Sequence, residues 1–371
     1  MTAARIVGAS ESPYARHPGD GVTTESLLAD AFVRVLASAG IERDDVDGLG
    51  LASFTLAPDR AIDLAWRLGV RPRWLMDDGN GGASGIQLLQ HAVHAIDAGD
   101  ASTVVLLAGD RLDRDTFRSL VDNYNRATAL HLASIPTGGP NTLFALLTQR
   151  HMDLHGLERA DYGRLVVAQR RRASRNPGAV YREPLTLDEY LAAPVVAEPL
   201  HLYDCTPIVS GADALVVRRA DHGVAVAALR AQHNRDGQEG DGLVTGLADI
   251  AEALWTDAGA GPADMDIVSV YDDYPAMALV QLADLGFAPD QKRFLHEELD
   301  RLALNTSGGQ LSAGQAGAAG GMHGLVEIVT QLLGRADRRQ VPAARLGVVS
   351  GYGMVLYRYG ACANAVVLER T

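Results

Sequence analysis

The sequence predicts an α/β fold in which helices cover both faces of a sheet. Short apolar strands alternate with amphipathic helices in the N-terminal and C-terminal parts of the chain, and a mainly helical stretch separates the two parts. A helix-to-strand unit at 83–108 also has a counterpart at 319–351, and both helices begin with small residues. Two similar halves of this kind indicate an internal duplication.

The N-terminal part carries the pattern β-α-β-α-β. Apolar side chains at helical spacing, with Gly40 as a stop signal, predict the first helix at 23–39. The elements expected after it are a strand at 47–54, a helix at 57–69, a helix from about 83 to 98 and a strand at 102–109.

From Asp110 to about Pro199 the alternation gives way to helices rich in arginine and histidine, joined by Pro-Gly turns. Such an insertion usually lies over the sheet edges and shapes a pocket. We therefore expect an N-terminal half at 1–222 that includes the insertion, and a C-terminal half at 223–371. The later elements expected are strands at 213–218, 224–231, 267–273, 346–351 and 364–370, and helices at 243–258, 274–285 and 319–333.

Composition narrows the class of protein. The chain has 371 residues and a formal net charge of −13, so no positive field favours nucleic acid. No apolar run is long enough to cross a hydrocarbon core of about 30 Å. Only Cys205 and Cys362 are cysteines, and no basic-then-apolar leader is evident, so a reducing cytoplasm is expected. His151 and His155 are four residues apart but lack a third ligand nearby, so neither a metal site nor a cofactor is expected.

Two glycine clusters are candidates for ligand binding. DDGNGGASG at 77–85 precedes a long helix and presents main-chain N–H groups at a helix N-terminus, where anions are stabilised. The cluster at 305–324 has the same character and adds polar side chains. A plain tight turn in the first cluster, and close helix packing in the second, remain alternative interpretations.

These motifs are similar to those of the thiolase superfamily. GASGIQLLQHAVHAIDAGDASTVVLLAGDR resembles its nucleophile helix, which typically reads Cys-Ala-Ser-Gly, and the segment at 174–217 is similar to sterol-carrier-type thiolases. NTSGGQLSAGQAGAAGG stands where the family has Asn-x-x-Gly-Gly and then Gly-His-Pro. VSVYDDYP matches its His-Asp-x-Phe or Asn-Glu-x-Phe loop, and the C-terminal strand ending VVLER matches its Cys-x-Gly strand. The resemblance covers nearly the whole chain in order. It implies a five-layered αβαβα thiolase fold with an inserted helical loop domain.

The catalytic positions depart from the family pattern. Gly82 stands where thiolases carry the acylated cysteine, and Gln315 replaces the Gly-His-Pro histidine. Tyr357 takes the place of the second cysteine, and Tyr271 that of the loop histidine or asparagine. Thiolysis requires a thiolate and a base that activates it, so the resemblance does not extend to that reaction.

A retro-aldol cleavage of a β-hydroxyacyl-CoA requires only a base and an oxyanion hole. Tyrosine has a free pKa of about 10, which a positive helix end or nearby donors lower. We expect Tyr357 to be the base, with His323 and Tyr352 as further candidates. The resemblance implies that Tyr271 and Gln315 act as donors to the thioester oxygen, and that the main-chain N–H groups of Gly82 and Tyr359 form a second hole. Asn305 in the second glycine cluster and Arg172 in the insertion are expected to bind substrate, Arg172 through a CoA phosphate.

The chain resembles most the lipid-transfer-protein-like branch of the superfamily, whose members are aldolases of steroid side-chain degradation that lack the cysteine. This resemblance implies cleavage of a steroid side-chain CoA ester to a ketone and a short acyl-CoA such as propionyl-CoA. It also implies a homodimer, and a heterotetramer with a small OB-fold and zinc-ribbon protein. A non-catalytic acyl-CoA-binding or scaffold subunit is an alternative, and a thiolase-like acyltransferase is another.

Overall fold

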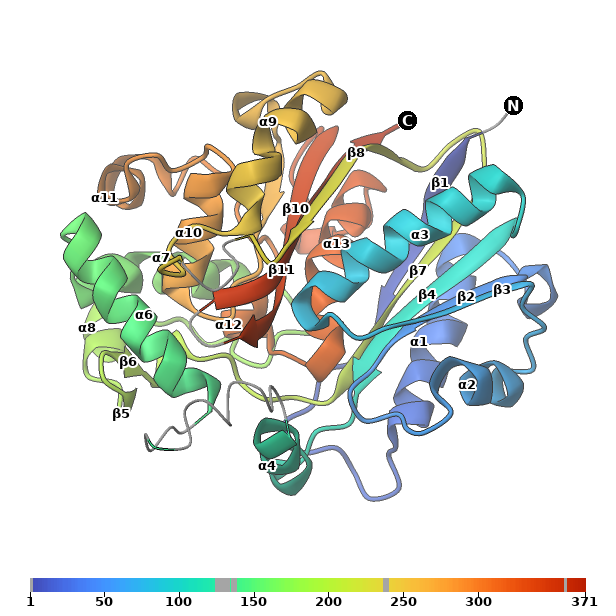
Figure 1. The fold of residues 1–371 in the computed structure, drawn as a ribbon, viewed down its shortest axis with the longest axis horizontal. Helices are drawn as coiled ribbons and strands as arrows, with labels where there is room; N and C mark the ends of the chain where they lie inside the picture. Colours follow the sequence, from blue (N-terminus) through green and yellow to red (C-terminus); the bar gives the residue numbers. More distant parts are fainter. Residues whose placement is uncertain (1–2, 124–133, 135–138, 236–239, 357–358) are drawn as a thin grey trace.

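A computed structural model describes residues 3–123, 134, 139–235, 240–356 and 359–371. Nine strands form one continuous sheet in the order β3-β2-β4-β7-β1-β8-β11-β10-β9, and a separate two-stranded hairpin, β5-β6, lies in the insertion (Figure 1). The strands are β1 (Ala4–Glu11), β2 (Gly48–Ala52), β3 (Trp74–Asp78), β4 (Thr103–Asp110), β5 (Val195–Ala197), β6 (Leu200–His201), β7 (Gly211–Arg219), β8 (Val224–His233), β9 (Ile267–Ser269), β10 (Leu346–Leu356) and β11 (Tyr359–Arg370).

The helices gather around this sheet. In Figure 1 the insertion helices between residues 140 and 191 lie together at the left, whereas the helix Arg114–Asn123 lies apart from them at the bottom. The described α-helices are α1 (Thr24–Ala39), α2 (Arg60–Leu68), α3 (Ser84–Ala98), α4 (Arg114–Asn123), α6 (Pro140–His155), α7 (Arg159–Ala173), α8 (Leu187–Leu191), α9 (Gly246–Ala258), α10 (Pro275–Asp284), α11 (Gln291–Arg293), α12 (Gly309–Ala313) and α13 (Gly320–Leu332).

The pairing of the strands shows the duplication. In the N-terminal half β2 and β4 are parallel, β4 and β7 are antiparallel, and β7 and β1 are antiparallel. In the C-terminal half β9 and β10 are parallel, β10 and β11 are antiparallel, and β11 and β8 are antiparallel. The two series are therefore equivalent strand by strand. They meet where Ile6 of β1 pairs with Val224 of β8.

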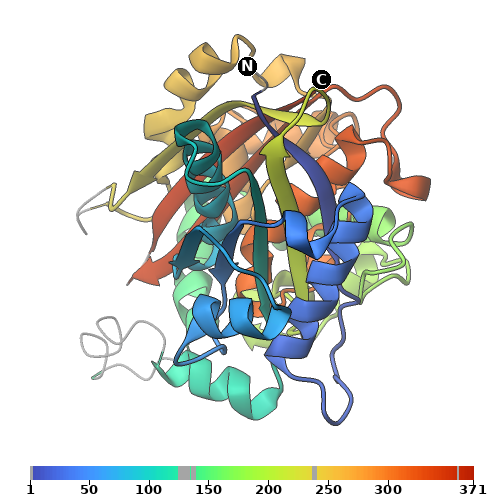
Figure 2. The ribbon, with the colours of Figure 1, turned by 90° about the vertical axis from the view of Figure 1, so that its right-hand side faces the viewer.

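The three largest apolar cores of the described residues fill the space between five layers, and the central core serves two of the interfaces. One core lies between α1, α2 and the outer face of the N-terminal strands, and Figure 2 shows α1 lying over these strands. The central core joins α3 and α13 to the inner faces of both halves, and the third joins α9, α10 and the insertion to the outer face of the C-terminal strands. In β4, Val104 and Leu106 face the central core whereas Val105 and Leu107 face the outer one, because side chains alternate along a strand. The predicted layering is confirmed.

The two central helices pack closely at glycines. A Cβ atom on Gly85 of α3 would lie 2.2 Å from the carbonyl oxygen of Gly321 in α13, and one on Gly321 would lie 2.7 Å from the carbonyl oxygen of Gly81. These contacts require residues without side chains, so close helix packing accounts for part of both glycine clusters. The same contacts fix the N-terminus of α13 against the turn that precedes α3.

Most predicted elements are present, but four strands, β1, β3, β5 and β6, were missed, and the strands expected at 47–54 and 267–273 are shorter than predicted. The strands β1 and β3 do not form apolar runs. Buried and part-exposed residues alternate along most of β1, and in β3 only Asp78 is buried. The strand expected at 267–273 ends at Ser269, since Asn305 binds the main chain of the next residue, Val270. Within the described residues, no helix combines the length and the apolar character that a membrane span needs.

Candidate active site

A cavity of about 600 Å³ opens between the insertion and the two halves. Its walls come from the turn before α3, the loop after β9, the end of β10, and helices α4 and α6. Gly82, Tyr271 and Gln315, three of the residues expected at the site, line this one cavity. The rest of the wall is mainly apolar and aromatic, which suits a bulky apolar group.

Gly82 and Tyr271 are in direct contact. A Cβ atom on Gly82 would lie 2.4 Å from Cε2 and Cζ of Tyr271 and 2.1 Å from the carbonyl oxygen of Tyr352. Real Cβ atoms do not approach other atoms so closely, so the tyrosine ring occupies the space that a side chain at position 82 would need. Glycine at position 82 therefore has two consequences. It removes the nucleophile, and it leaves space for the phenol of Tyr271.

The phenol of Tyr271 belongs to a short chain of hydrogen bonds. Gln315 Nε2 donates to Tyr271 Oη at 2.5 Å, and Gln315 Oε1 accepts from Thr206 Oγ1 at 3.2 Å. A phenol that accepts a hydrogen bond is a stronger donor itself. This arrangement suits an oxyanion hole.

The main chain around Tyr271 is held rigidly. Gln281 Nε2 donates to Tyr271 O at 2.6 Å, Tyr271 N donates to Gln281 Oε1 at 3.3 Å, and Ser350 Oγ donates to the same Oε1 at 2.9 Å. Asn305 makes the equivalent pair of bonds to the residue before, with Val270 N donating to its Oδ1 at 2.9 Å and its Nδ2 donating to Val270 O at 3.2 Å. Asn305 does not line the cavity, and its side chain holds the main chain of the loop.

Asp110, at the end of β4, ties two parts of the cavity wall together. Its Oδ1 accepts from Phe54 N at 2.9 Å and from Ser53 Oγ at 2.8 Å, and its Oδ2 accepts from Ala318 N at 2.8 Å. Burial raises the pKa of this carboxyl group against the effect of these donors. The carboxyl group thereby joins the N-terminal and C-terminal halves beside Phe54 and Gly317 of the cavity wall.

The two aspartates after Tyr271 point in different directions. Asp272 is buried and accepts from Gln310 N at 2.8 Å and Gln169 Nε2 at 3.0 Å, and burial raises its pKa to about 7. Asp273 lines the cavity, and its Oδ1 accepts from Tyr274 N at 3.0 Å. Burial, together with the charge of Asp272, raises the pKa of Asp273 well above its usual value.

The two cysteines are poor nucleophiles. Neither forms a disulfide. Cys205 lines the cavity, but burial and two nearby carboxylates raise its pKa to about 12. Burial raises the pKa of Cys362 to about 11. Because the thiolate is the reactive form, both thiols are inert at neutral pH.

Arg172 lies away from the cavity. It donates from Nη1 to Leu304 O at 2.5 Å and from Nη2 to Leu302 O at 2.7 Å, and burial lowers its pKa to about 10. Its guanidinium group therefore holds the chain before the second glycine cluster. The arginines that do line the cavity are Arg114 and Arg118 of α4.

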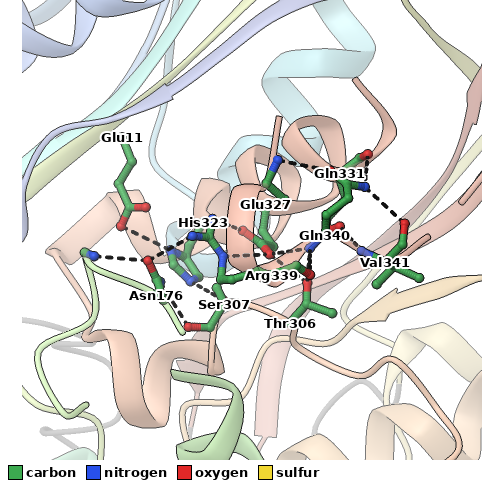
Figure 3. A network of polar contacts seen from close by, with 12 residues as sticks. Glu11, Asn176, Thr306, Ser307, His323, Glu327, Gln331, Arg339, Gln340 and Val341 are labelled. Atoms are coloured by element: carbon green, nitrogen blue, oxygen red, sulfur yellow. Dashed lines mark hydrogen bonds and ion pairs between the residues drawn. The ribbon is translucent and has the colours of Figure 1, made fainter. Parts of the chain in front are cut away.

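His323 is also outside the cavity wall. It lies in the buried polar network of Figure 3, with Nε2 at 2.8 Å from Ser307 Oγ and Nδ1 at 3.8 Å from Glu11 Oε1. The same network contains the ion pair between Arg339 and Glu327, at 2.8 Å. Burial lowers the pKa of His323 to about 4, so the ring is neutral at pH 7. It anchors the loop at 305–308.

Tyr357 lies outside the described residues, and its role stays a prediction. Tyr359 begins β11 and pairs with Leu356 of β10, but only its main chain is described. His151, weighed as a metal ligand, has its Nδ1 at 2.7 Å from Tyr162 Oη. Across the described part of the chain, no three His, Cys, Asp or Glu side chains group as a metal site would.

Sequence reasoning missed Asp273, Arg114 and Arg118. Asp273 belongs to the loop motif VSVYDDYP, but the resemblance to thiolases assigned a role only to Tyr271 in that motif. The signal for α4 was its spacing, since Arg114, Phe117, Arg118 and Val121 recur at i, i+3, i+4 and i+7 and all line the cavity.

Comparison with known proteins agrees with the predicted family and fold. A family model described as "Thiolase C-terminal domain-like" matches residues 228–368. The chain is 30% identical to "17-hydroxy-3-oxo-4-pregnene-20-carboxyl-CoA lyase" of Mycobacterium tuberculosis, over 95% of this chain and 97% of the relative. It is 28% identical to "Steroid side-chain-cleaving aldolase" of Thermomonospora curvata, over 95% and 96%.

A solved structure named "Ltp2-ChsH2(DUF35) aldolase" superimposes with a TM-score of 0.86 at 26% identity, covering 100% of this chain and 98% of that one. The prediction of an aldolase of thiolase fold thus agrees with the named relatives. The chain belongs to the thiolase superfamily, in the branch of the steroid side-chain-cleaving aldolases.

Proposed function

We propose that this chain is a carbon–carbon lyase that cleaves a β-hydroxyacyl-CoA, of the class of steroid side-chain CoA esters, to a ketone and a short acyl-CoA such as propionyl-CoA. The observation that carries the proposal is the contact of the Tyr271 ring with Gly82. It leaves no space for an acylated side chain, while hydrogen-bond donors still line the cavity. The activities named for the relatives support the same reaction class.

In the proposed reaction a base takes the proton of the β-hydroxyl group, the Cα–Cβ bond breaks, and its electron pair moves onto the thioester as an enolate. Tyr357 is the proposed base. Tyr271 Oη and Gln315 Nε2 are the proposed donors to the enolate oxygen, since an amide NH₂ that donates once to Tyr271 has a second N–H. The main-chain N–H groups of Gly82 and Tyr359 are the proposed second hole.

We also propose that Arg114 and Arg118 contact the phosphates of the CoA moiety. Both lie on the cavity face of α4, and guanidinium groups bind phosphate in a planar, bidentate manner. Phe117 and Val121 on the same face are apolar and suit the acyl group. One face of α4 would thus contact both the CoA phosphates and the acyl group of the substrate.

A homodimer is proposed on the exposed edge of the sheet. Strand β3 is the last strand of the order, and Leu75 on it and Trp66 on α2 are 37% and 79% exposed. A heterotetramer with a small OB-fold and zinc-ribbon protein is proposed in addition, supported by the DUF35 component named in the similar solved aldolase. A cytoplasmic location is proposed from the two unpaired cysteines.

The test is to incubate the full chain, alone and with such a partner, with 17-hydroxy-3-oxo-4-pregnene-20-carboxyl-CoA, and to detect ketone and propionyl-CoA by mass spectrometry. The matched ester without the 17-hydroxyl group has no proton for the base and should not be cleaved. Tight binding of the hydroxy ester without product under every condition would instead indicate a non-catalytic subunit. A covalent acyl-enzyme in the intact mass would indicate an acyltransferase.

A further inference from the structure

The proposed cleavage requires a second proton transfer that the residues discussed so far do not supply. After the Cα–Cβ bond breaks, the enolate of the short acyl-CoA must gain a proton at Cα. The Cα atom is one bond from the thioester carbon, so its proton donor must line the same cavity as Tyr271 and Gln315, the donors to the thioester oxygen.

Only one group on the described cavity wall is suited to this task. A guanidinium group does not release its proton, the thiol of Cys205 has a pKa of about 12, and phenols are weak acids with a pKa of about 10. The remaining titratable group is the carboxyl of Asp273. The titratable side chains that line the cavity are those of Arg114, Arg118, Cys205, Tyr271, Asp273, Tyr274 and Tyr352.

The local structure aims Asp273 at the cavity. Its neighbour Asp272 is directed away, into the main-chain N–H groups at the start of α12. Tyr274 follows, and its ring stacks on Phe144 of α6 with centroids 4.3 Å apart, which fixes the start of α10. Asp273 Oδ1 accepts from Tyr274 N at 3.0 Å, so one carboxyl oxygen is anchored to the main chain.

We propose that Asp273 is the general acid that protonates Cα of the enolate, an inference that rests on the proposed function. Its O–H bond breaks, a new C–H bond forms at Cα, and the electron pair of the enolate supplies that bond. The carboxylate left behind recovers a proton through solvent from the base that took the hydroxyl proton. The net change is one proton moved from oxygen to carbon, with no oxidant or cofactor.

The electrostatic surroundings support this role. Burial and the charge of Asp272 raise the pKa of Asp273 well above its usual value, which favours the protonated form that a proton donor needs. The other titratable groups around it are Cys205, whose thiol is neutral, the phenols of Tyr271 and Tyr274, and the two arginines on α4 across the cavity.

The test uses the reverse partial reaction, which needs no ketone. By microscopic reversibility, the group that protonates Cα also removes a proton from it. Wild-type protein incubated with propionyl-CoA in D₂O should exchange the α-hydrogens, faster as rising pH ionises Asp273. In Asp273→Asn the exchange and the cleavage rate should both fall by about 100-fold or more, with an unchanged Kd for propionyl-CoA. Asp273→Glu should restore part of both.

A matched control is Asp284→Asn. Asp284 is another carboxyl whose pKa burial raises, to about 6, but it accepts from Thr245 and does not line the cavity. This variant should lose stability and keep the exchange rate. Exchange at the wild-type rate in Asp273→Asn would overturn the inference while leaving the lyase in place. If the exchange depends on Asp273 but the protein cleaves no hydroxyacyl-CoA, the role of Asp273 in proton transfer is supported and the proposed cleavage is overturned.

Discussion

The ring of Tyr271 lies against the Cα atom of Gly82, in the space where a larger residue at position 82 would place its side chain. The two residues are 189 positions apart in the sequence and come from different halves of the fold. The space that a nucleophilic side chain at position 82 would fill is therefore taken by the phenol of Tyr271, which is hydrogen-bonded to Gln315. We propose that this pair favours carbon–carbon cleavage over acyl transfer, because the contact leaves no space for an acylated side chain at position 82.

Gly82→Ala should destabilise the protein by about 1–3 kcal/mol, because the new Cβ atom meets the main chain of Tyr352 as well as the Tyr271 ring. Thermal unfolding and the cleavage rate would measure this, and both should decrease. Gly79→Ala is the matched control, since nothing lies within 4 Å of a Cβ atom there. Equal stability of the two variants would contradict the contact.

Tyr271→Phe should lower kcat by about 10²–10³-fold with little change in KM, because it removes one oxyanion donor and the acceptor of Gln315 Nε2. Steady-state kinetics on the hydroxyacyl-CoA would show the split. Tyr162→Phe removes a comparable phenol, bonded to His151 outside the cavity, and should leave kcat unchanged. A Tyr271→Phe enzyme with the wild-type kcat would exclude the phenol from the oxyanion hole.

Replacing both Arg114 and Arg118 with alanine should raise KM for the CoA ester by about 10-fold or more, because each charge-assisted hydrogen bond is worth about 1.5–3 kcal/mol. KM for the corresponding pantetheine ester, which lacks the nucleotide phosphates, should not change. Arg34→Ala, in an exposed ion pair on α1, is the control of equal charge. An equal rise in KM for both esters would show that Arg114 and Arg118 do not bind the nucleotide phosphates of CoA.

The raised pKa of Glu11 should make the folded protein less stable as the pH rises. Burial, and the nearby charge of Glu327, raise its pKa from 4.5 to about 7 in the folded protein, while Arg339 acts in the opposite direction. The folded state then holds a proton that the unfolded state releases between these values, so this contribution to stability is present below pH 4.5 and is lost as the pH rises through 7. His323 and Asp213 face the same group.

Glu11→Gln should therefore become more stable relative to the wild type as the pH rises over this range. Urea unfolding at both ends of the range would measure the difference, and the comparison of two pH values cancels any constant effect of the substitution. A stability difference that does not vary with pH would show that Glu11 ionises normally in the folded protein.

Much of the site was predictable because its signals are local. Helix ends, apolar runs and the order of motifs predicted the strands and helices of both halves, and the absence of cysteine at 82 and histidine at 315 excluded thiolysis. The boundary between the halves near residue 222 stays a prediction. The strands β1 and β3 were not predicted, because the burial of their residues alternates or is only partial.

The sequence by itself determined the family, the layered fold and the loss of the nucleophile, because these depend on residue identity and on short-range periodicity. Only the tertiary structure decided which polar residues share the cavity. It assigned Asn305 and Arg172 to main-chain carbonyl and amide groups, His323 to a buried network, and Asp273 with two arginines to the cavity wall. The physical reason is that a polar side chain acts on whatever packing places beside it, and those neighbours come from distant parts of the chain.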